Sequence, residues 1–115
     1  VYFHPYHYKK DRRGRAVVLS EFGGYNYRVE NHAWNNVDFG YKRASSCEEL
    51  IRSYRCLYEE EILPARAQGL SASVYTQLTD VEDELNGLLT YDREIMKIPD
   101  EILREINARV SGAME

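Results

Sequence analysis

The most regular hydrophobic pattern along the chain lies between residues 46 and 69. Large apolar side chains recur there at the spacing of one face of a helix. These side chains are Leu50, Tyr54, Leu57, Tyr58 and Ile62. The pattern therefore predicts a helix over this whole segment.

Both ends of this helix carry recognisable signals. Ser46 followed by Glu49 is typical of a capping box, and residues 45–48 offer an alternative frame one residue earlier. Gly69 is a natural helix stop. Pro64 lies close to that end, where we expect it to kink the helix or to tighten its last turn.

Two shorter apolar stretches predict strands. Residues 15–22 hold a continuous apolar core that stops at Gly23 and Gly24, which is typical of a strand buried on both faces in a parallel sheet. Residues 71–81 are β-branched and aromatic and contain neither glycine nor proline, so they predict a second strand. That strand is expected to run into an acidic loop at residues 82–84.

The remaining segments predict loops and one more helix. Residues 1–14 are aromatic, basic and turn-prone, and residues 25–45 lack periodicity, so both are expected to be loops. A structureless loop of about 20 residues is usually functional when it occurs in a compact domain. Pro and Asp at 99–100 are typical of a helix start. The apolar side of this helix comprises Leu103, Ile106 and Val110.

The order strand, loop, helix, strand, loop, helix predicts an α/β fold with a parallel sheet and right-handed crossovers. Residues 1–115 are expected to form one such region, without internal repeats. Functional groups collect at the carboxyl ends of strands in sheets of this kind. This rule points to Glu21 at the first strand tip and to residues 75–80 at the second.

Composition and charge narrow the class of protein. At 115 residues the chain is too short for a complete eight-stranded α/β barrel, which takes about 250 residues. A formal net charge of −4 disfavours nucleic-acid binding, which depends on Lys and Arg side chains that neutralise phosphates. The basic stretch at residues 9–15 is short and is expected to be a solvated loop. No apolar run approaches the roughly 18 residues of a membrane span, so no membrane partner is expected.

The two cysteines bear on the cellular compartment. Cys47 and Cys56 lie nine residues apart in the predicted helix. Nine steps of about 100° place them on opposite faces, so they are expected to be free thiols. Free thiols favour a reducing compartment, and we expect a cytoplasmic location. The segment from Val1 has no secretion signal, and we expect the chain to be part of a longer protein.

Two residues stand out as candidates for chemistry. Glu21 follows a buried apolar run and precedes glycines that let a ligand approach, which suits a nucleophile or a general base. The alternative is an ion-paired glutamate at a strand end. Trp34, in the long loop, suits stacking on a sugar face, and it equally suits anchoring of that loop.

Metal chemistry has little support in the sequence. Asp80 and the acidic residues 82–84 lack the alternating ligands, central glycine and distal glutamate of a calcium loop. His4 and His7 are three residues apart beside a proline, and His32 is distant in sequence. We therefore expect no metal and no cofactor.

Three segments resemble one family. Residues 18–24, Val-Leu-Ser-Glu-Phe-Gly-Gly, resemble the nucleophile strand of glycoside hydrolase family 2, which includes β-galactosidases, β-glucuronidases and β-mannosidases. Residues 74–84, Val-Tyr-Thr-Gln-Leu-Thr-Asp-Val-Glu-Asp-Glu, resemble its final barrel strand, and residues 86–93, Asn-Gly-Leu-Leu-Thr-Tyr-Asp-Arg, its exit loop. The resemblance extends over residues 15–110 and implies the last two β-α units of a (β/α)8 TIM barrel.

The resemblance also implies a chemistry. Glu21 matches the catalytic nucleophile, Tyr75 an aromatic residue of the sugar-binding subsite, and Asp80 an acidic residue near the same rim. The acid/base glutamate of the family has no counterpart in this sequence. Retaining glycosidases need two carboxyl groups about 5–5.5 Å apart. The chain alone is therefore expected to lack glycosidase activity, and its implied partners are a carbohydrate substrate and the rest of the barrel.

The nature of the sugar is suggested by one short segment. Glucuronidases of this family place an Asn-x-Lys before the glycine to hold the sugar carboxylate, whereas residues 84–86 read Glu-Leu-Asn. This difference disfavours uronic acids and favours a neutral sugar such as galactose.

Two other functions fit the same pattern. One is a non-catalytic carbohydrate-binding or interaction module descended from a barrel. The other is a structural domain that assembles through the helices predicted at 46–69 and 100–110. Self-association is expected in that case, because two isolated barrel strands leave open edges that invite pairing with another chain.

Overall fold

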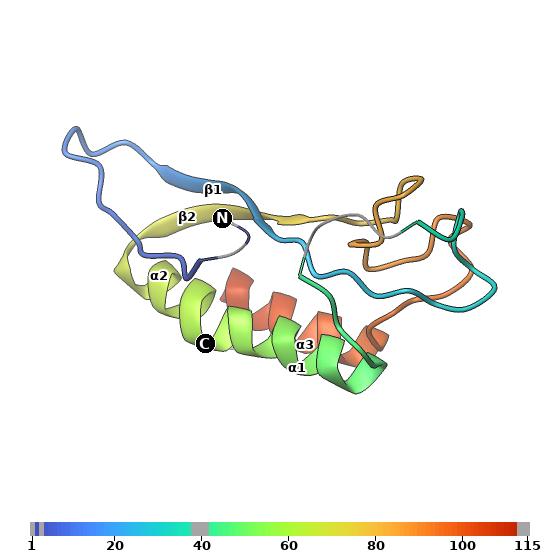
Figure 1. The fold of residues 1–115 in the computed structure, drawn as a ribbon. Coiled ribbons are helices and arrows are strands. Elements are labelled where there is room, and N and C mark those ends of the chain that lie inside the picture. Colours follow the sequence, from blue (N-terminus) through green and yellow to red (C-terminus); the bar gives the residue numbers. More distant parts are fainter. Residues whose placement is uncertain (1, 3, 38–41, 113–115) are drawn as a thin grey trace.

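Two parallel strands and a set of helices on one side of them form the fold (Figure 1). The computed structural model describes residues 2, 4–37 and 42–112, so residues 38–41 of the predicted long loop lie outside the described residues. Strand β1 spans Val17–Gly23 and pairs in parallel with β2, Leu70–Thr76. The predicted α/β class with a parallel strand pair is confirmed.

A nearly continuous helical segment connects the two strands. It consists of α1, Cys47–Leu57, the π-helical turn η1, Tyr58–Ile62, and α2, Leu63–Gln68. The Ser46 side chain caps α1 by accepting a hydrogen bond from the Glu49 N–H at 3.1 Å. Gly69 ends α2 with a φ of 127°, a value that favours glycine. The predicted helix over 46–69 is confirmed, with Ser46 as its cap.

The effect of Pro64 on this segment differs from the prediction. Proline has no N–H, so Pro64 cannot donate to the carbonyl of Glu60 four residues earlier. Around this missing bond the helix opens, and the Leu63 N–H bonds to the Tyr58 carbonyl five residues back. The expectation of a tightened turn was therefore wrong: the turn before Pro64 is widened.

The second strand is shorter than predicted. It ends at Thr76 instead of continuing to residue 81. Strand β1 turns away at Gly23 and Gly24, whose φ values are 92° and 73°, so β2 loses its partner there. The Gln77 N–H bonds instead to the Asn86 carbonyl at 3.1 Å. The end of β2 thus depends on where β1 turns away. It could not be predicted from the residues of β2 alone.

The core lies between the sheet and the helices. All five apolar residues of the predicted helical face are buried, which confirms that pattern. They pack with Leu19 and Phe22 of β1, and Phe22 makes an edge-to-face contact with Tyr58 at 5.6 Å between ring centroids. The last helix, α3, spans Asp100–Ser111 directly after Pro99, as predicted, and its Ile106 is fully buried.

The opposite face of the sheet has no helix on it within the described residues (Figure 1). Val18 of β1 and Val74 of β2 alternate with core-facing residues and remain 52% and 54% exposed. Parallel sheets are usually covered on both faces. A two-stranded parallel sheet with one open apolar face is therefore an unusual arrangement for an isolated domain.

The cysteines and the helix lengths agree with the sequence analysis. Cys47 and Cys56 are both free thiols, as their opposite helical positions predicted. Across the described ranges, each helix is too short or too polar to cross a membrane.

Candidate functional site

Glu21 lies on β1, two residues before its end, and its side chain is exposed. The strand register shifts between Leu19 and Phe22, so Glu21 and its neighbour Ser20 are both exposed while the flanking apolar residues are buried. The expected position at the strand tip is thus corrected by two residues. The irregularity leaves the Glu21 carboxylate exposed to solvent between the buried residues Leu19 and Phe22.

The Glu21 carboxylate has a defined hydrogen-bond partner. The Tyr2 hydroxyl donates to Glu21 Oε2 at 3.0 Å, and the same hydroxyl lies 3.2 Å from Thr76 Oγ1. Thr76 is the last residue of β2, so Tyr2 bridges the carboxyl-terminal halves of both strands. This contact orients the carboxylate and leaves it accessible. No sequence pattern marks Tyr2, because its segment was expected to be an irregular loop.

The glycines after Glu21 accommodate a side chain of the protein itself. A Cβ atom on Gly23 would lie 2.3 Å from the Tyr75 ring, a distance that real Cβ contacts do not reach. The sequence predicted that these glycines let a ligand approach, whereas at Gly23 the space is occupied by the Tyr75 ring.

Tyr75 lies on the helix-facing side of the sheet. Its ring makes edge-to-face contacts with Phe22 at 5.6 Å and with Tyr54 at 5.1 Å. Burial raises the pKa of the Tyr75 phenol well above its ordinary value, so the group stays protonated at neutral pH. Its ring is part of the aromatic core, whereas the Glu21 carboxylate is exposed. The structure therefore assigns Tyr75 a clear packing role beneath the strand that carries Glu21.

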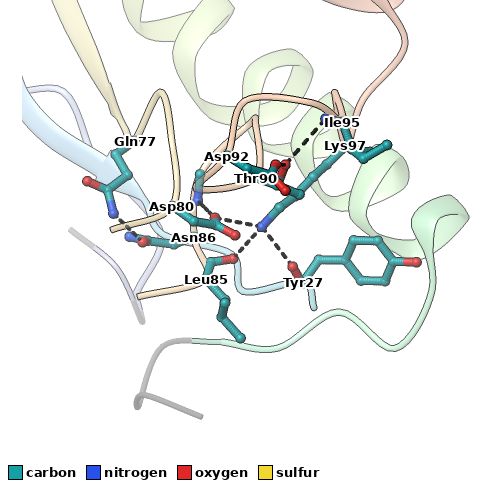
Figure 2. A network of polar contacts seen from close by, with 10 residues as sticks. Tyr27, Gln77, Asp80, Leu85, Asn86, Thr90, Asp92, Ile95 and Lys97 are labelled. Carbon is teal, nitrogen blue, oxygen red and sulfur yellow. Dashed lines mark hydrogen bonds and ion pairs between the residues drawn. The ribbon is translucent and has the colours of Figure 1, made fainter. Parts of the chain in front are cut away.

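Asp80 belongs to a buried ion pair (Figure 2). Asp80 Oδ1 lies 2.7 Å from Lys97 Nζ and also accepts the Gly87 N–H at 2.8 Å. Both side chains of the pair are nearly inaccessible to solvent. Burial raises the pKa of Asp80 and lowers that of Lys97, and the attraction between the two opposes both changes. Asp80 thus points into the protein and not toward the surface.

Lys97 uses all of its hydrogen-bonding capacity inside the protein. Besides Asp80, its Nζ contacts the carbonyl oxygens of Tyr27 at 2.7 Å and Leu85 at 2.9 Å. Three oxygen acceptors require three N–H donors, which only the ammonium form of lysine provides. Lys97 is therefore charged, and it joins the loop after β1 to the segment after β2 (Figure 2).

The turn at Asn86 and Gly87 completes this network. The Asn86 side-chain oxygen accepts a hydrogen bond from Gln77 Nε2 at 2.7 Å. A Cβ on Gly87 would lie 2.2 Å from the backbone nitrogen of Asp80. Only glycine fits at this position, so Gly87 is required by the close packing of two backbone segments.

Trp34 lies in the loop that follows β1. Its side chain is 57% exposed, and its ring contacts the Tyr91 ring edge-to-face at 5.6 Å. The neighbouring Asn35 side chain donates a hydrogen bond to the Asp83 carboxylate. Trp34 is thus held at the surface by contacts with the segment after β2.

One group of metal-ligating side chains comes together within the described residues. His32 Nδ1 lies 2.8 Å from Asp92 Oδ2 and 3.6 Å from Glu94 Oε2. Hydrogen bonds from Thr90 and His32 lower the pKa of Asp92 to about 2. The acidic residues considered in the sequence do not gather, since Asp80 pairs with Lys97 and Asp83 with Asn35.

A small hollow adjoins the Glu21 partner Tyr2. Its volume is about 160 Å³, and its walls include Tyr6, Gly23, Tyr25 and Glu61. Ligand pockets for small molecules usually measure about 300–1,000 Å³. Among the residues that the structure describes, the Glu21 carboxylate is therefore exposed, and the hollow next to Tyr2 is smaller than a usual ligand pocket.

Comparison with known proteins adds no evidence on the function of the chain. No protein-family model matches the chain, and no curated protein sequence matches it. The resemblance to glycoside hydrolase family 2 therefore remains a hypothesis that rests on the motifs themselves. The residue on which this hypothesis depends is Glu21, whose carboxylate is exposed on a parallel strand.

Proposed function

We propose that this chain is the C-terminal part of the catalytic barrel of a retaining β-glycosidase of the glycoside hydrolase family 2 type. The observation that carries the proposal is the exposed Glu21 carboxylate, held by Tyr2 at 3.0 Å on a strand whose apolar neighbours are buried. In α/β barrels, catalytic side chains come from the carboxyl ends of the parallel strands. Glu21 lies in that half of β1.

The open face of the sheet supports the barrel hypothesis. In a (β/α)8 barrel the helices cover the outer face, and the inner face packs against the side chains of the other strands. In the described part of the chain, strands β1 and β2 have helices on one face only, and Val18 and Val74 are exposed on the other. Six further strands would cover this face and would pair with the two free edges.

Glu21 acts as the nucleophile in this proposal. Its carboxylate oxygen attacks the anomeric carbon, and the bond from that carbon to the leaving oxygen breaks as a second carboxyl group protonates the leaving oxygen. Water then attacks the resulting glycosyl ester, the second group takes a proton from it, and Glu21 leaves as a carboxylate. The second carboxyl group is supplied by another part of the barrel. The chain alone is consequently inactive.

The other site residues have different roles in this proposal. Trp34 contacts the carbohydrate through its exposed ring. Tyr75 supports β1 from beneath, and the Asp80–Lys97 pair fixes the loops that border the site. The favoured substrate is a neutral β-glycoside such as a galactoside.

Trapping of the glycosyl-enzyme tests the assignment of Glu21. A longer protein that contains this chain is incubated with an activated 2-deoxy-2-fluoro-β-galactoside, and the labelled peptide is identified by mass spectrometry. We expect the label on Glu21, none in Glu21→Gln, and normal labelling in Glu30→Gln, an exposed glutamate of the following loop. A label on another residue would show that Glu21 is not the nucleophile.

The incompleteness of the site has a separate test. The purified 115-residue chain is assayed with chromogenic β-glycosides, and we expect no turnover above the uncatalysed rate. Robust turnover by the chain, free of longer forms, would contradict the claim that the second carboxyl group lies elsewhere.

A non-catalytic carbohydrate-binding or assembly module is the second candidate. The exposed Val18 and Val74 side chains and the two free edges of the sheet favour it, because such surfaces promote pairing with another chain. Light scattering on the purified chain distinguishes the cases. Stable dimers, together with a failure of Glu21 labelling in the longer protein, would favour the assembly role.

A further inference from the structure

The loop after β1 and the segment after β2 lie side by side beyond the carboxyl ends of the strands (Figure 1). Around Trp34 they are joined by His32 Nδ1, which lies 2.8 Å from Asp92 Oδ2, and by the Asn35 amide, which donates a hydrogen bond to the Asp83 carboxylate. Trp34 lies between His32 and Asn35 in the sequence. The residues on either side of Trp34, His32 and Asn35, are therefore both hydrogen-bonded to the segment after β2.

Trp34 and Tyr91 form an aromatic pair across this junction. Their ring planes meet at 86°, and the two side chains remain 57% and 40% exposed. A large aromatic side chain gains free energy when its apolar surface leaves water. Here the chain holds the indole in solvent by contacts on both sides, which keeps an apolar ring face available to a ligand.

Polar atoms gather beside the aromatic pair. The ligand atoms of His32, Asp92 and Glu94 lie within 4.8 Å of one another, and Asp92 directly follows Tyr91. Carboxylates accept hydrogen bonds from hydroxyl groups. An aromatic face next to clustered carboxylate acceptors matches a sugar ring, which has an apolar C–H face and a rim of hydroxyl donors.

We propose that Trp34, Tyr91, Asp92 and Glu94 form a carbohydrate subsite distinct from the sugar position at Glu21. The inference rests on the proposed function for its ligand class, and it extends that function to a substrate of at least two sugar units. The proposed ligand is a neutral sugar, because among the described residues the carboxylates of Asp83, Asp92 and Glu94 outnumber the one guanidinium that contacts this loop, that of Arg28 at the carbonyl oxygens of Asn35 and Val37.

Fluorescence of the purified chain tests the subsite directly, because Trp34 is its single tryptophan. Titration with lactose or cellobiose is expected to give a saturable blue shift of the emission and protection from acrylamide quenching. Glucuronic acid is expected to give neither effect. Absence of a saturable response to both disaccharides would overturn the proposal.

Variants define which residues bind the sugar. Tyr91→Ala is expected to weaken the disaccharide affinity about two- to tenfold, the range for loss of one aromatic contact. Glu94→Gln is expected to weaken it as well. Glu30→Gln changes an exposed glutamate of the loop that carries Trp34, and it is expected to leave the affinity unchanged. Circular dichroism establishes that each variant is folded. Equal affinities for all variants would place the sugar elsewhere and contradict the proposal.

Two further outcomes are informative. A response to zinc chloride but to no disaccharide, abolished in His32→Ala, would assign the cluster to a metal ion and overturn the sugar subsite. The test is also independent of Glu21. Loss of Glu21 labelling with a normal disaccharide response would refute the nucleophile alone, and the reverse result would refute the subsite alone.

Discussion

Lys97 and Asp80 form an ion pair at 2.7 Å from which solvent is almost wholly excluded. The ammonium group also binds the carbonyl oxygens of Tyr27 and Leu85, so one side chain holds three segments of the chain together. These segments carry the loops that border the candidate site. The pair therefore contributes both to the stability of the domain and to the position of the loops that border the candidate site.

Replacement of Lys97 by methionine is expected to destabilise the domain strongly. It leaves the Asp80 carboxylate buried without a counter-charge, a situation that costs roughly 3–5 kcal/mol in proteins. Burial raises the pKa of Asp80, so protonation relieves this cost, and the loss is expected to be greater at neutral pH than in mild acid. Urea denaturation of the variant and the wild type at both pH values measures the difference.

The double variant Asp80→Asn/Lys97→Met is the control for this prediction. It removes both charges, and the asparagine oxygen still accepts the Gly87 N–H. We expect it to be more stable than Lys97→Met alone, since no buried charge remains. Strictly additive losses would show that Asp80 and Lys97 are not energetically coupled.

Gly87→Ala is expected to destabilise the turn after β2. The new methyl group would lie 2.2 Å from the Asp80 backbone nitrogen and 2.3 Å from the Thr79 carbonyl carbon, and backbone atoms cannot move aside cheaply. A loss of about 3 kcal/mol is expected, at the upper end for overpacking. Gly14→Ala serves as the comparison, because nothing lies within 4 Å of its Cβ and only its positive φ costs about 1 kcal/mol. Equal losses in urea denaturation would contradict the clash.

Asp92 is expected to contribute to stability in a defined pH range. Hydrogen bonds from Thr90 and His32 lower its pKa to about 2, below the ordinary value of 3.8. A carboxyl group with a lowered folded-state pKa stabilises the protein above its unfolded pKa, and that contribution is lost as pH falls through the folded value. Asp92→Asn should therefore flatten the decline in stability between about pH 4 and pH 2.

Urea denaturation across this pH range checks the Asp92 prediction. Glu101→Gln, which removes an exposed carboxylate in the first turn of α3, is the matched control and should follow the wild-type curve. Parallel curves for Asp92→Asn and the wild type would mean that the Thr90 and His32 contacts do not stabilise the ionised form.

Glu21→Gln is expected to separate function from stability. The residue is exposed, so its substitution should change the free energy of unfolding by no more than about 0.5 kcal/mol. In the longer protein the same change should abolish turnover and trapping by the fluoro-glycoside. Tyr2→Phe should slow trapping without preventing it, because it removes only the 3.0 Å hydrogen bond that orients the carboxylate. A folded Glu21→Gln variant with wild-type turnover would refute the proposed mechanism.

Much of the fold follows from local sequence patterns. The helical spacing of Leu50, Tyr54 and Leu57 identified a face that is buried, and Ser46 and Gly69 marked the two ends of the segment. These signals are local, since they depend on residues within one or two helical turns. They therefore predict elements well and contacts between elements poorly.

The contacts that build the candidate site are long-range. His32 meets Asp92, and Lys97 meets Tyr27, across distances in sequence that no periodicity spans. One local signal for Lys97 exists: it interrupts the apolar run Ile-Met-Lys-Ile at residues 95–98, and a lone charge in such a run is often buried with a partner. The sequence did not indicate that Asp80 is the partner of Lys97, because Asp80 stands next to the acidic residues 82–84.

The parallel pairing of β1 with β2 also determines the order in which the chain can fold. Val17 meets Leu70 only after α1, η1 and α2 lie between them, whereas each helical turn forms from neighbouring residues. Local helices form quickly, and closure of a long loop is slow. During synthesis, β1 therefore leaves the ribosome before its partner strand exists, and the backbone N–H and C=O groups that pair with β2 have no strand partner until residues 70–76 have been made.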